Sequence, residues 1–306
     1  MASQKRKRFS EIAIQTFEEC SEGTYFTEDG EERPNLGKLV NDAVSQSEMC
    51  SEGYIESTFR KCLKTYIDNN TKYPKIIDFW QMTSVEAIKK ISEEESARDP
   101  HFSLGVLNFA SAVQVGGGAM NGATAQEESL IRTSGLYHCL SPFDDNFYVL
   151  PKRKGIYSNF AILSPSVPFF KNDDCEASHW DEPVSVDVVT MAAVNMREFR
   201  PQTRAGREMA QKLMHKRIRL VLKSFELMGT KTIILGAWGC GVFGNDNHKI
   251  AKLFYETIVE HIALGPRRFI FAIPDLDTFI PFYDCFHSAS NSTSNPYSIK
   301  TNHVCQ

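Results

Sequence analysis

The stretch at residues 116–128 constrains the fold of this chain more than any other. It opens with three consecutive glycines, Gly116, Gly117 and Gly118, directly after an apolar run at 104–110 that is typical of a buried strand. Glycine permits backbone angles that side chains forbid and lets backbone N–H groups approach an anionic group closely. The sequence therefore predicts a strand that leads into a glycine cradle for a phosphate.

Three polar side chains close this stretch: Gln126, Glu127 and Glu128. Thr124 precedes Glu127 by three residues, which is the pattern of a capping box and predicts a helix that starts at Thr124. Adjacent helical residues point roughly 100° apart, so the two glutamates cannot do the same job. Glu127 fits the capping position and can also accept from a ligand hydroxyl, whereas Glu128 is free to face a bound ligand. A pair of surface glutamates favoured by the helix dipole is the competing interpretation.

A second glycine loop at 236–244 follows an apolar strand predicted at 231–235. It supplies six candidate ligand-binding residues: Gly239, Cys240, Gly241, Val242, Phe243 and Gly244. The spacing of its glycines matches the dinucleotide fingerprint, but that fingerprint should open the first βα unit of its domain, with an acidic residue about 20 residues on. In this chain only one convincing strand follows the second glycine loop, whereas a dinucleotide-binding domain should have several strands after it. A diphosphate held between the two loops explains the glycines better than a nicotinamide dinucleotide does.

Strands alternate with helices along most of the chain, which predicts an α/β layer fold. Strands are expected at 75–80, 104–110, 160–163, 184–190, 231–235 and 269–273, and helices at 8–20, 83–96, 124–137, 203–228 and 247–262. We expect an N-terminal accessory segment at 1–74, a catalytic domain at 75–287 and a disordered tail at 288–306. Residues 140–185 are expected to form a long surface excursion.

Composition and charge exclude several classes of function. The net charge of −4 provides no general attraction for nucleic acid, and no apolar run approaches the length of a membrane span. Eight cysteines without a Cys-x-x-Cys pair, and no apolar leader, favour a reducing, intracellular compartment, nuclear or cytoplasmic. The basic run from Lys5 to Arg8 is a weak nuclear signal or a solvated helix start. No zinc motif is present, so no metal and no cofactor are expected.

The glycine and glutamate stretch resembles the bacterial-type poly(ADP-ribose) glycohydrolases, which carry three glycines, a short spacer and then Gln-Glu-Glu. The resemblance extends roughly over residues 8–275 and is strongest at 107–128 and 233–246. It implies a macrodomain, a three-layer α/β/α fold with a mixed sheet, whose two glycine loops surround ADP-ribose. That family usually places Asn-Pro before the glycines, whereas this chain has Gln114 and Val115 there.

The resemblance also implies an activity, the metal-independent hydrolysis of ribose–ribose O-glycosidic bonds. It assigns the role of general acid to Glu128, places Phe243 against the terminal ribose, and implies poly(ADP-ribose) or an ADP-ribosylated protein as substrate. From the residues alone, Asn108 is an even choice between a ribose contact and a buried structural amide, and Asn195 is a weaker candidate. Phe279 or Phe282 could stack on the adenine. We expect a monomer that needs no membrane, and residues 1–7 are expected to carry no part of catalysis.

Two other functions stay open at this point. One is a binding module that recognises ADP-ribose without cleaving it, although such a module has no need of paired glutamates after the cradle. The other is a nicotinamide-dependent oxidoreductase, which the position of the dinucleotide fingerprint disfavours.

Overall fold

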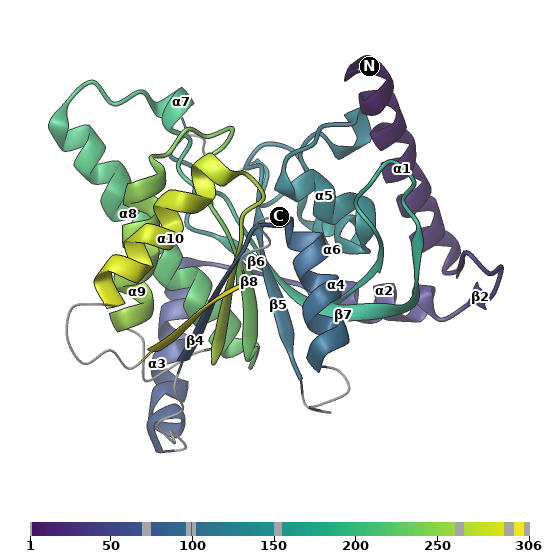
Figure 1. Ribbon diagram of the computed structural model, residues 1–306, viewed down its shortest axis with the longest axis horizontal. Helices are drawn as coiled ribbons and strands as arrows, with labels where there is room; N and C mark the ends of the chain where they lie inside the picture. The colour runs from purple at the N-terminus through teal and green to yellow at the C-terminus, as the bar shows by residue number, and fades with distance from the viewer. Residues whose placement is uncertain are drawn as a thin grey trace.

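Among the residues that the structure describes, eight strands form one mixed sheet at the centre of the molecule, in the order β10-β4-β9-β8-β5-β7-β6-β3 (Figure 1). This computed structural model describes residues 2–68, 75–95, 99, 102–149, 155–260, 266–290 and 297–302. The parallel part comprises β10 (Tyr297–Asn302), β4 (Lys75–Trp80), β9 (Arg268–Ala272), β8 (Thr232–Leu235), β5 (Leu104–Phe109) and β7 (His179–Met191). Two antiparallel strands, β6 (Ala161–Lys171) and β3 (Glu48–Cys50), complete it.

Helices cover both faces of the sheet and enclose two hydrophobic cores. One face packs against α3 (Glu52–Asp68), α8 (Arg204–Leu227), α9 (Asn247–Glu260) and α10 (Leu276–Ser290). The other packs against α1 (Ala2–Glu22), α2 (Leu36–Gln46), α4 (Ser84–Glu95), α5 (Gln126–Thr133) and α6 (Leu136–Leu140). Successive strand residues point to opposite faces, so Leu107 enters the first core and Val106 the second. The expected three-layer α/β/α fold is confirmed.

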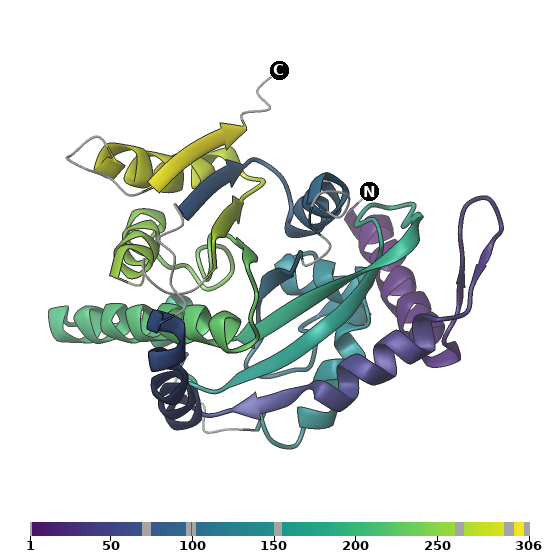
Figure 2. The ribbon, with the colours of Figure 1, turned by 90° about the horizontal axis from the view of Figure 1, so that it is seen from below.

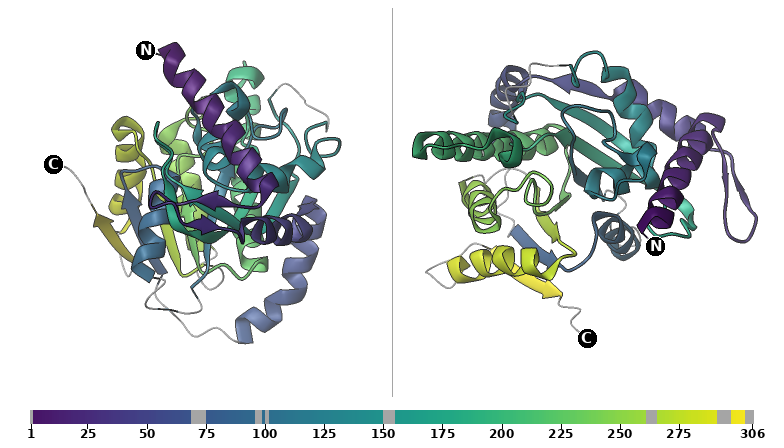
Figure 3. Two further views of the ribbon diagram at one scale, coloured as in Figure 1. Left: turned by 90° about the vertical axis from the view of Figure 1, so that its right-hand side faces the viewer. Right: turned by 90° about the horizontal axis from the view of Figure 1, so that it is seen from above.

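The N-terminal segment is continuous with this sheet. After α1 come a short antiparallel hairpin, β1 (Tyr25–Phe26) with β2 (Glu32–Arg33), then α2 and the edge strand β3. The left view of Figure 3 shows α1 running across the front of the molecule, over the teal segments that include α5. The described part of the segment at 1–74, expected to be accessory, thus contributes β3 to the main sheet and α1, α2 and α3 to the layers that cover it.

The second half of the surface excursion expected at 140–185 is instead a long hairpin of β6 and β7 (Figure 2). Proline disfavours a regular ladder, and Pro165 obscures the strand in the sequence. The structure accommodates it in an irregularity between Ser164 and Val167, where Ser166 has a φ of +54°. The irregularity lets β6 continue past the proline, so the interpretation as an excursion was wrong.

The C-terminal tail, expected to be disordered over 288–306, includes a strand. Residues 297–302 form β10, which pairs in parallel with β4, and α10 extends to Ser290. The edge of β4 would otherwise present unpaired backbone groups, which a further strand satisfies. Residues 291–296 and 303–306 lie outside the described residues.

Short helices and turns complete the description. The 3₁₀ turns are η1 (Ala119–Asn121) and η2 (Ser141–Phe143), and α7 (Met196–Phe199) follows β7. The helix expected at 124–137 is divided into α5 and α6 by a break at Ser134 and Gly135. The helix expected at 203–228 is observed as α8, with Thr203 as its N-cap.

Candidate active site

The two glycine loops meet at one cavity. The first follows β5 and the second follows β8, and these two strands are neighbours in the parallel part of the sheet. The cavity has a volume of about 690 Å³ and lies beyond the carboxyl ends of the strands, where open α/β sheets bind ligands. Nine of the residues expected at the site line it: Gly117, Gly118, Gln126, Glu127, Glu128, Gly239, Gly241, Val242 and Phe243.

The first loop needs its glycines because of the carboxylates beside it. Gly116 and Gly117 have φ of +61° and +58°, in the left-handed region. A Cβ on Gly117 would lie 2.5 Å from Glu128 Oε1 and 2.8 Å from Glu127 Oε2. Gly116 does not line the cavity, since its side-chain position faces Ile131 and Tyr137. Gly117 is therefore the point at which the backbone passes directly against both glutamates.

The capping box expected between Thr124 and Glu127 does not form. The N-cap of α5 is Ala125, without a side-chain hydrogen bond, so the helix begins at Gln126. Glu127 instead accepts from the backbone N–H of Ser111 at 2.7 Å and from Asn108 Nδ2 at 3.2 Å. Because both donors come from the end of β5, the carboxylate turns toward the sheet and away from its own helix end.

The position of Glu127 is reflected in its pKa. The side chain is 3% exposed, and burial raises the pKa of its carboxyl to about 8, although the bonds from Ser111 and Asn108 act in the opposite direction. The neighbouring Glu128 carboxylate adds to the increase. Asn108 lies behind Glu127 and not on the cavity wall, which makes it a buried support of the site.

Glu128 has one oxygen held by the loop and one without a partner. Oε1 accepts from the backbone N–H of Gly118 at 2.8 Å. Oε2 is buried and accepts no hydrogen bond from any residue that the structure describes. Glu128 lines the cavity, and its second oxygen is a buried acceptor whose hydrogen-bonding capacity no described residue uses.

Gln126 binds the backbone of the neighbouring strand. Its Oε1 accepts from the N–H of Phe109 at 2.9 Å, and its Nε2 donates to the carbonyl of Leu107 at 2.9 Å and to Ser84 Oγ at 3.2 Å. These bonds fasten the first turn of α5 to the end of β5. Gln126 lines the cavity while its amide is occupied by the protein.

The second loop contains glycines of two kinds, those that the protein itself requires and one that it does not. Gly239 has a φ of +78°, and a Cβ there would lie 2.7 Å from both Ala193 Cβ and Asn245 Nδ2. A Cβ on Gly241 would meet no atom within 4 Å. Within the described residues, the backbone N–H groups of Gly241, Val242 and Phe243 donate no hydrogen bond. Three consecutive free donors on a cavity wall are suited to an anion.

Phe243 is half-buried and belongs both to the loop and to the edge of the core. Its ring centroid lies 6.1 Å from that of Tyr157, and its carbonyl accepts from Met196 N at 2.8 Å. Cys240 and Gly244 do not line the cavity, because Cys240 packs against the core and the side-chain position of Gly244 faces Arg197.

Three weaker candidates lie away from the cavity. Asn195 is the N-cap of α7, and its Oδ1 accepts from the N–H of Glu198 at 3.1 Å. Phe279 and Phe282 are 1% and 0% exposed in the core, so stacking on an adenine by either ring is contradicted.

Five of the lining residues that sequence reasoning missed are Thr83, Ser111, Trp238, Asp275 and Thr278. All follow the carboxyl ends of β4, β5, β8 or β9, and that position was the signal that could have identified them.

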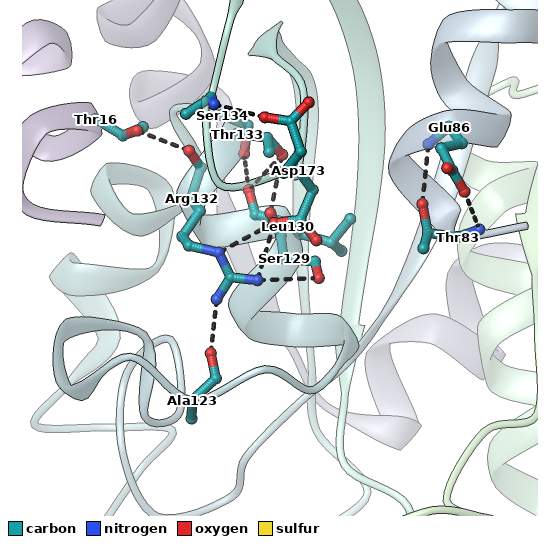
Figure 4. Close-up of polar contacts among 12 residues, drawn as sticks. Thr16, Thr83, Glu86, Ala123, Ser129, Leu130, Arg132, Thr133, Ser134 and Asp173 are labelled. Carbon is teal, nitrogen blue, oxygen red and sulfur yellow. Dashed lines mark hydrogen bonds and ion pairs between the residues drawn. The ribbon is translucent and has the colours of Figure 1, made fainter. Parts of the chain in front are cut away.

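The T-x-x-E pattern at Thr83 forms a true capping box, since Thr83 N donates to Glu86 Oε2 at 2.7 Å and Glu86 N to Thr83 Oγ1 at 3.2 Å (Figure 4).

The start of α1 touches the first loop. Arg6 Nε donates to the carbonyl of Asn121 at 2.9 Å, and Ser10 Oγ donates to that of Met120 at 2.6 Å. Gly122 packs so closely against the backbone of Arg6 that a side chain there would not fit. Residues 1–7, which the sequence separates from the site, thus include a residue in contact with the turn after the glycines.

The described part of the chain holds no group of three His, Cys, Asp or Glu side chains arranged to bind a metal ion. No helix within the described ranges has both the length and the apolar character needed to cross a membrane.

Comparisons with known proteins agree on one group. Residues 13–172 match the model of the microbial-type PARG catalytic domain. A mutant poly(ADP-ribose) glycohydrolase from Thermomonospora curvata superimposes with a TM-score of 0.78 at 28% identity, over 92% of this chain and 100% of that one. The same enzyme bound to the inhibitor ADP-HPD has a TM-score of 0.74 at 29% identity, over 93% and 100%. The enzyme from Deinococcus radiodurans in complex with ADP-ribose has a TM-score of 0.70 at 29% identity, over 81% and 97%. No curated protein sequence matches the chain.

Proposed function

Because the chain belongs to the family of microbial-type PARG catalytic domains, we propose that it hydrolyses the ribose–ribose O-glycosidic bonds of poly(ADP-ribose) and releases ADP-ribose. The observation that carries the proposal is the cavity-lining carboxyl of Glu128, with Oε1 held by Gly118 and Oε2 free among the described residues. A binding module would have no use for a carboxyl held in this way.

The proposed reaction uses Glu128 twice. Cleavage of the glycosidic bond needs a proton on the leaving ribose oxygen and stabilisation of an oxocarbenium-like centre. Glu128 Oε2 donates that proton, and the resulting carboxylate then takes a proton from the water that attacks the ribose carbon. The proton lost to the leaving group is thereby recovered from water, so the carboxyl is regenerated.

The glycine loops hold the ADP-ribose unit in this proposal. The free N–H groups of Gly241, Val242 and Phe243 bind diphosphate oxygens, and the open space at Gly241 lets the phosphates come close. Glu127 lines the same cavity and can accept from a ribose hydroxyl through a remaining lone pair. Phe243 packs against the terminal ribose.

The test is hydrolysis of polymer attached to an automodified protein, followed by chromatography of the products. We expect ADP-ribose from the unmutated protein and a rate lower by at least about 10²-fold for Glu128→Gln, because general acid–base catalysis is typically worth about 10²–10⁴-fold. Glu128→Gln should still bind ADP-ribose, measured by calorimetry, since both loops are intact.

Glu86→Gln is the matched control, because Glu86 also lies in the first turn of a helix but only completes a capping box. It should hydrolyse polymer at the unmutated rate. Hydrolysis by Glu128→Gln at the unmutated rate would contradict the assignment of the acid. Binding of ADP-ribose without any hydrolysis by the unmutated protein would support a reader of ADP-ribose instead.

A further inference from the structure

Arg132 lies one helical turn after Glu128 on α5, so the two side chains emerge from the same side of the helix. The residue is 1% exposed and therefore one of the most deeply buried charges in the described part of the chain. Its Nη1 donates to the carbonyl of Ala123 at 2.6 Å, and its Nη2 donates to Ser129 Oγ at 3.3 Å (Figure 4). The guanidinium thus reaches back to the loop that precedes its own helix.

The contact with Ala123 closes a ring of hydrogen bonds around the proposed acid. The N–H of Ala123 donates to the carbonyl of Gly118 at 3.1 Å. The N–H of Gly118 donates to Glu128 Oε1 at 2.8 Å. The ring runs from Arg132 through Ala123 and Gly118 to Glu128, and α5 itself joins its two ends.

Arg132 is in turn held from outside the ring. Asp173 Oδ1 accepts from its Nε at 3.0 Å and from its Nη2 at 2.9 Å. The ring of Phe9 from α1 lies 4.3 Å from the guanidinium carbon, and Thr16 Oγ1 donates to the Arg132 carbonyl at 2.7 Å. The side chain is therefore fixed by an ion pair, by an aromatic face and by its own helix.

We propose that Arg132 is a positioning residue: by holding Ala123 it fixes Gly118, whose N–H engages one oxygen of Glu128 and leaves the other toward the substrate. The inference rests on the proposed function, in which Glu128 is the acid. Arg132 does not line the cavity and acts only through the loop. The motif of glycines and glutamates assigns no function to this residue.

Lysine cannot replace arginine in this arrangement. The planar guanidinium donates hydrogen bonds to Asp173 from one edge and to the carbonyl of Ala123 from another. An ammonium is a single compact donor group and cannot span both acceptors in the same way. Arg132→Lys keeps the positive charge near Asp173, which limits the loss of stability. The substitution removes the hydrogen bond to the carbonyl of Ala123, so the loop that contains Gly118 loses this restraint.

The first experiment compares kcat and KM for polymer hydrolysis by Arg132→Lys and the unmutated protein. The rate is expressed per ADP-ribose-binding site, counted by calorimetric titration, so that a partly unfolded sample does not count as a slow one. We expect kcat per site to fall about 10- to 100-fold, since small misplacements of reacting groups are costly. KM and the Kd for ADP-ribose should stay within about twofold, because the second loop is unchanged.

Arg268→Lys is the matched control. Arg268 is also an ion-paired arginine with little exposure, bonded to Asp78 Oδ2 at 2.6 Å and to Glu95 Oε1 at 3.1 Å. It is the first residue of β9, at the end of the strand opposite the cavity. Its replacement should lower the melting temperature and leave kcat per site unchanged.

The second experiment needs no substrate. Hydrogen exchange of the Gly118 amide, followed by NMR, should be about fivefold to tenfold faster in Arg132→Lys and unaltered in Arg268→Lys. Asp173→Asn, which weakens only the anchor of the guanidinium, should give a smaller change in the same direction.

The outcomes separate this inference from the proposed function. Unchanged kcat per site together with unchanged Gly118 exchange in Arg132→Lys would overturn the positioning role. Faster Gly118 exchange in Arg132→Lys, together with an unmutated protein that cleaves no polymer, would support the hydrogen-bonded ring and overturn only the proposed hydrolysis.

Discussion

The two glycine loops look alike in the sequence, but Gly117 in the first and Gly241 in the second are required for different reasons. In the first loop, Gly117 has a positive φ and passes against the carboxylates of Glu127 and Glu128. In the second loop, Gly241 has no neighbour within 4 Å of its side-chain position, and its backbone N–H donates to no described residue. Contacts within the protein therefore require glycine at 117, whereas only a bound ligand would require glycine at 241.

This difference assigns separate tasks to the loops. A loop that is complete without a ligand can hold a reacting group in place before substrate arrives, which is the condition for preorganised catalysis. A loop with unused donors gains its partners when an anion binds. We accordingly expect changes in the first loop to affect turnover and changes in the second to affect affinity.

Gly117→Ala should give the largest effect. The new Cβ must displace the carboxyl of Glu128 or Glu127, so we expect polymer hydrolysis to fall about 10²-fold, as for other small misplacements of reacting groups. The positive φ should also cost about 1–2 kcal/mol of stability. Gly30→Ala is the control, because Gly30 has a φ of +81° and no neighbour within 4 Å. An equal loss of hydrolysis in both variants would show that backbone strain, and not the carboxylates, is responsible.

Gly241→Ala should come next. A methyl group fits the protein here without contact, so the melting temperature should not change. The same methyl group would occupy the space through which phosphates approach the free N–H groups, and we expect the Kd for ADP-ribose to rise about tenfold. Calorimetric titration measures this directly. A Kd that stays at the unmutated value would remove the second loop from the diphosphate site.

Phe243→Ala tests whether the second loop also touches the ribose. Because the ring is only half-buried, the loss of unfolding free energy should be below the about 3–5 kcal/mol expected for a fully buried phenylalanine. We expect turnover to fall several-fold at the same time. Phe225→Ala, in which a 0% exposed ring is removed, provides the reference for a purely structural loss. Equal destabilisation of the two variants would make Phe243 a core residue.

Glu127 provides a test of another kind, the pH dependence of stability. Its folded-state pKa of about 8 lies above its ordinary value of 4.5, so the folded protein keeps a proton that the unfolded chain loses in this range. The resulting stability is present below 4.5 and is lost as the pH rises toward about 8. Glu127→Gln does not titrate. Relative to it, the unmutated protein should lose unfolding free energy across this range, as measured by urea denaturation; parallel pH profiles would contradict the raised pKa.

The same four-residue pattern occurs at Thr83 and at Thr124, and only one of the two forms a capping box. At Thr83, no other described residue hydrogen-bonds the Glu86 carboxylate, so the local interaction prevails. At Thr124, the N–H of Ser111 and the amide of Asn108 attract Glu127 from 16 and 19 residues away. The outcome depends on a strand end that the local pattern does not contain.

The sequence by itself determined the alternation of strands and helices, the two glycine loops and the paired glutamates, because glycine content and apolar periodicity are local properties. The tertiary structure decided the rest. It placed both loops on neighbouring strands, turned Glu127 toward β5, and left one oxygen of Glu128 free. It also brought Arg132, Asp173 and Phe9 together behind the acid. These arrangements depend on contacts between residues far apart in the chain, which form only when the sheet and its helices pack.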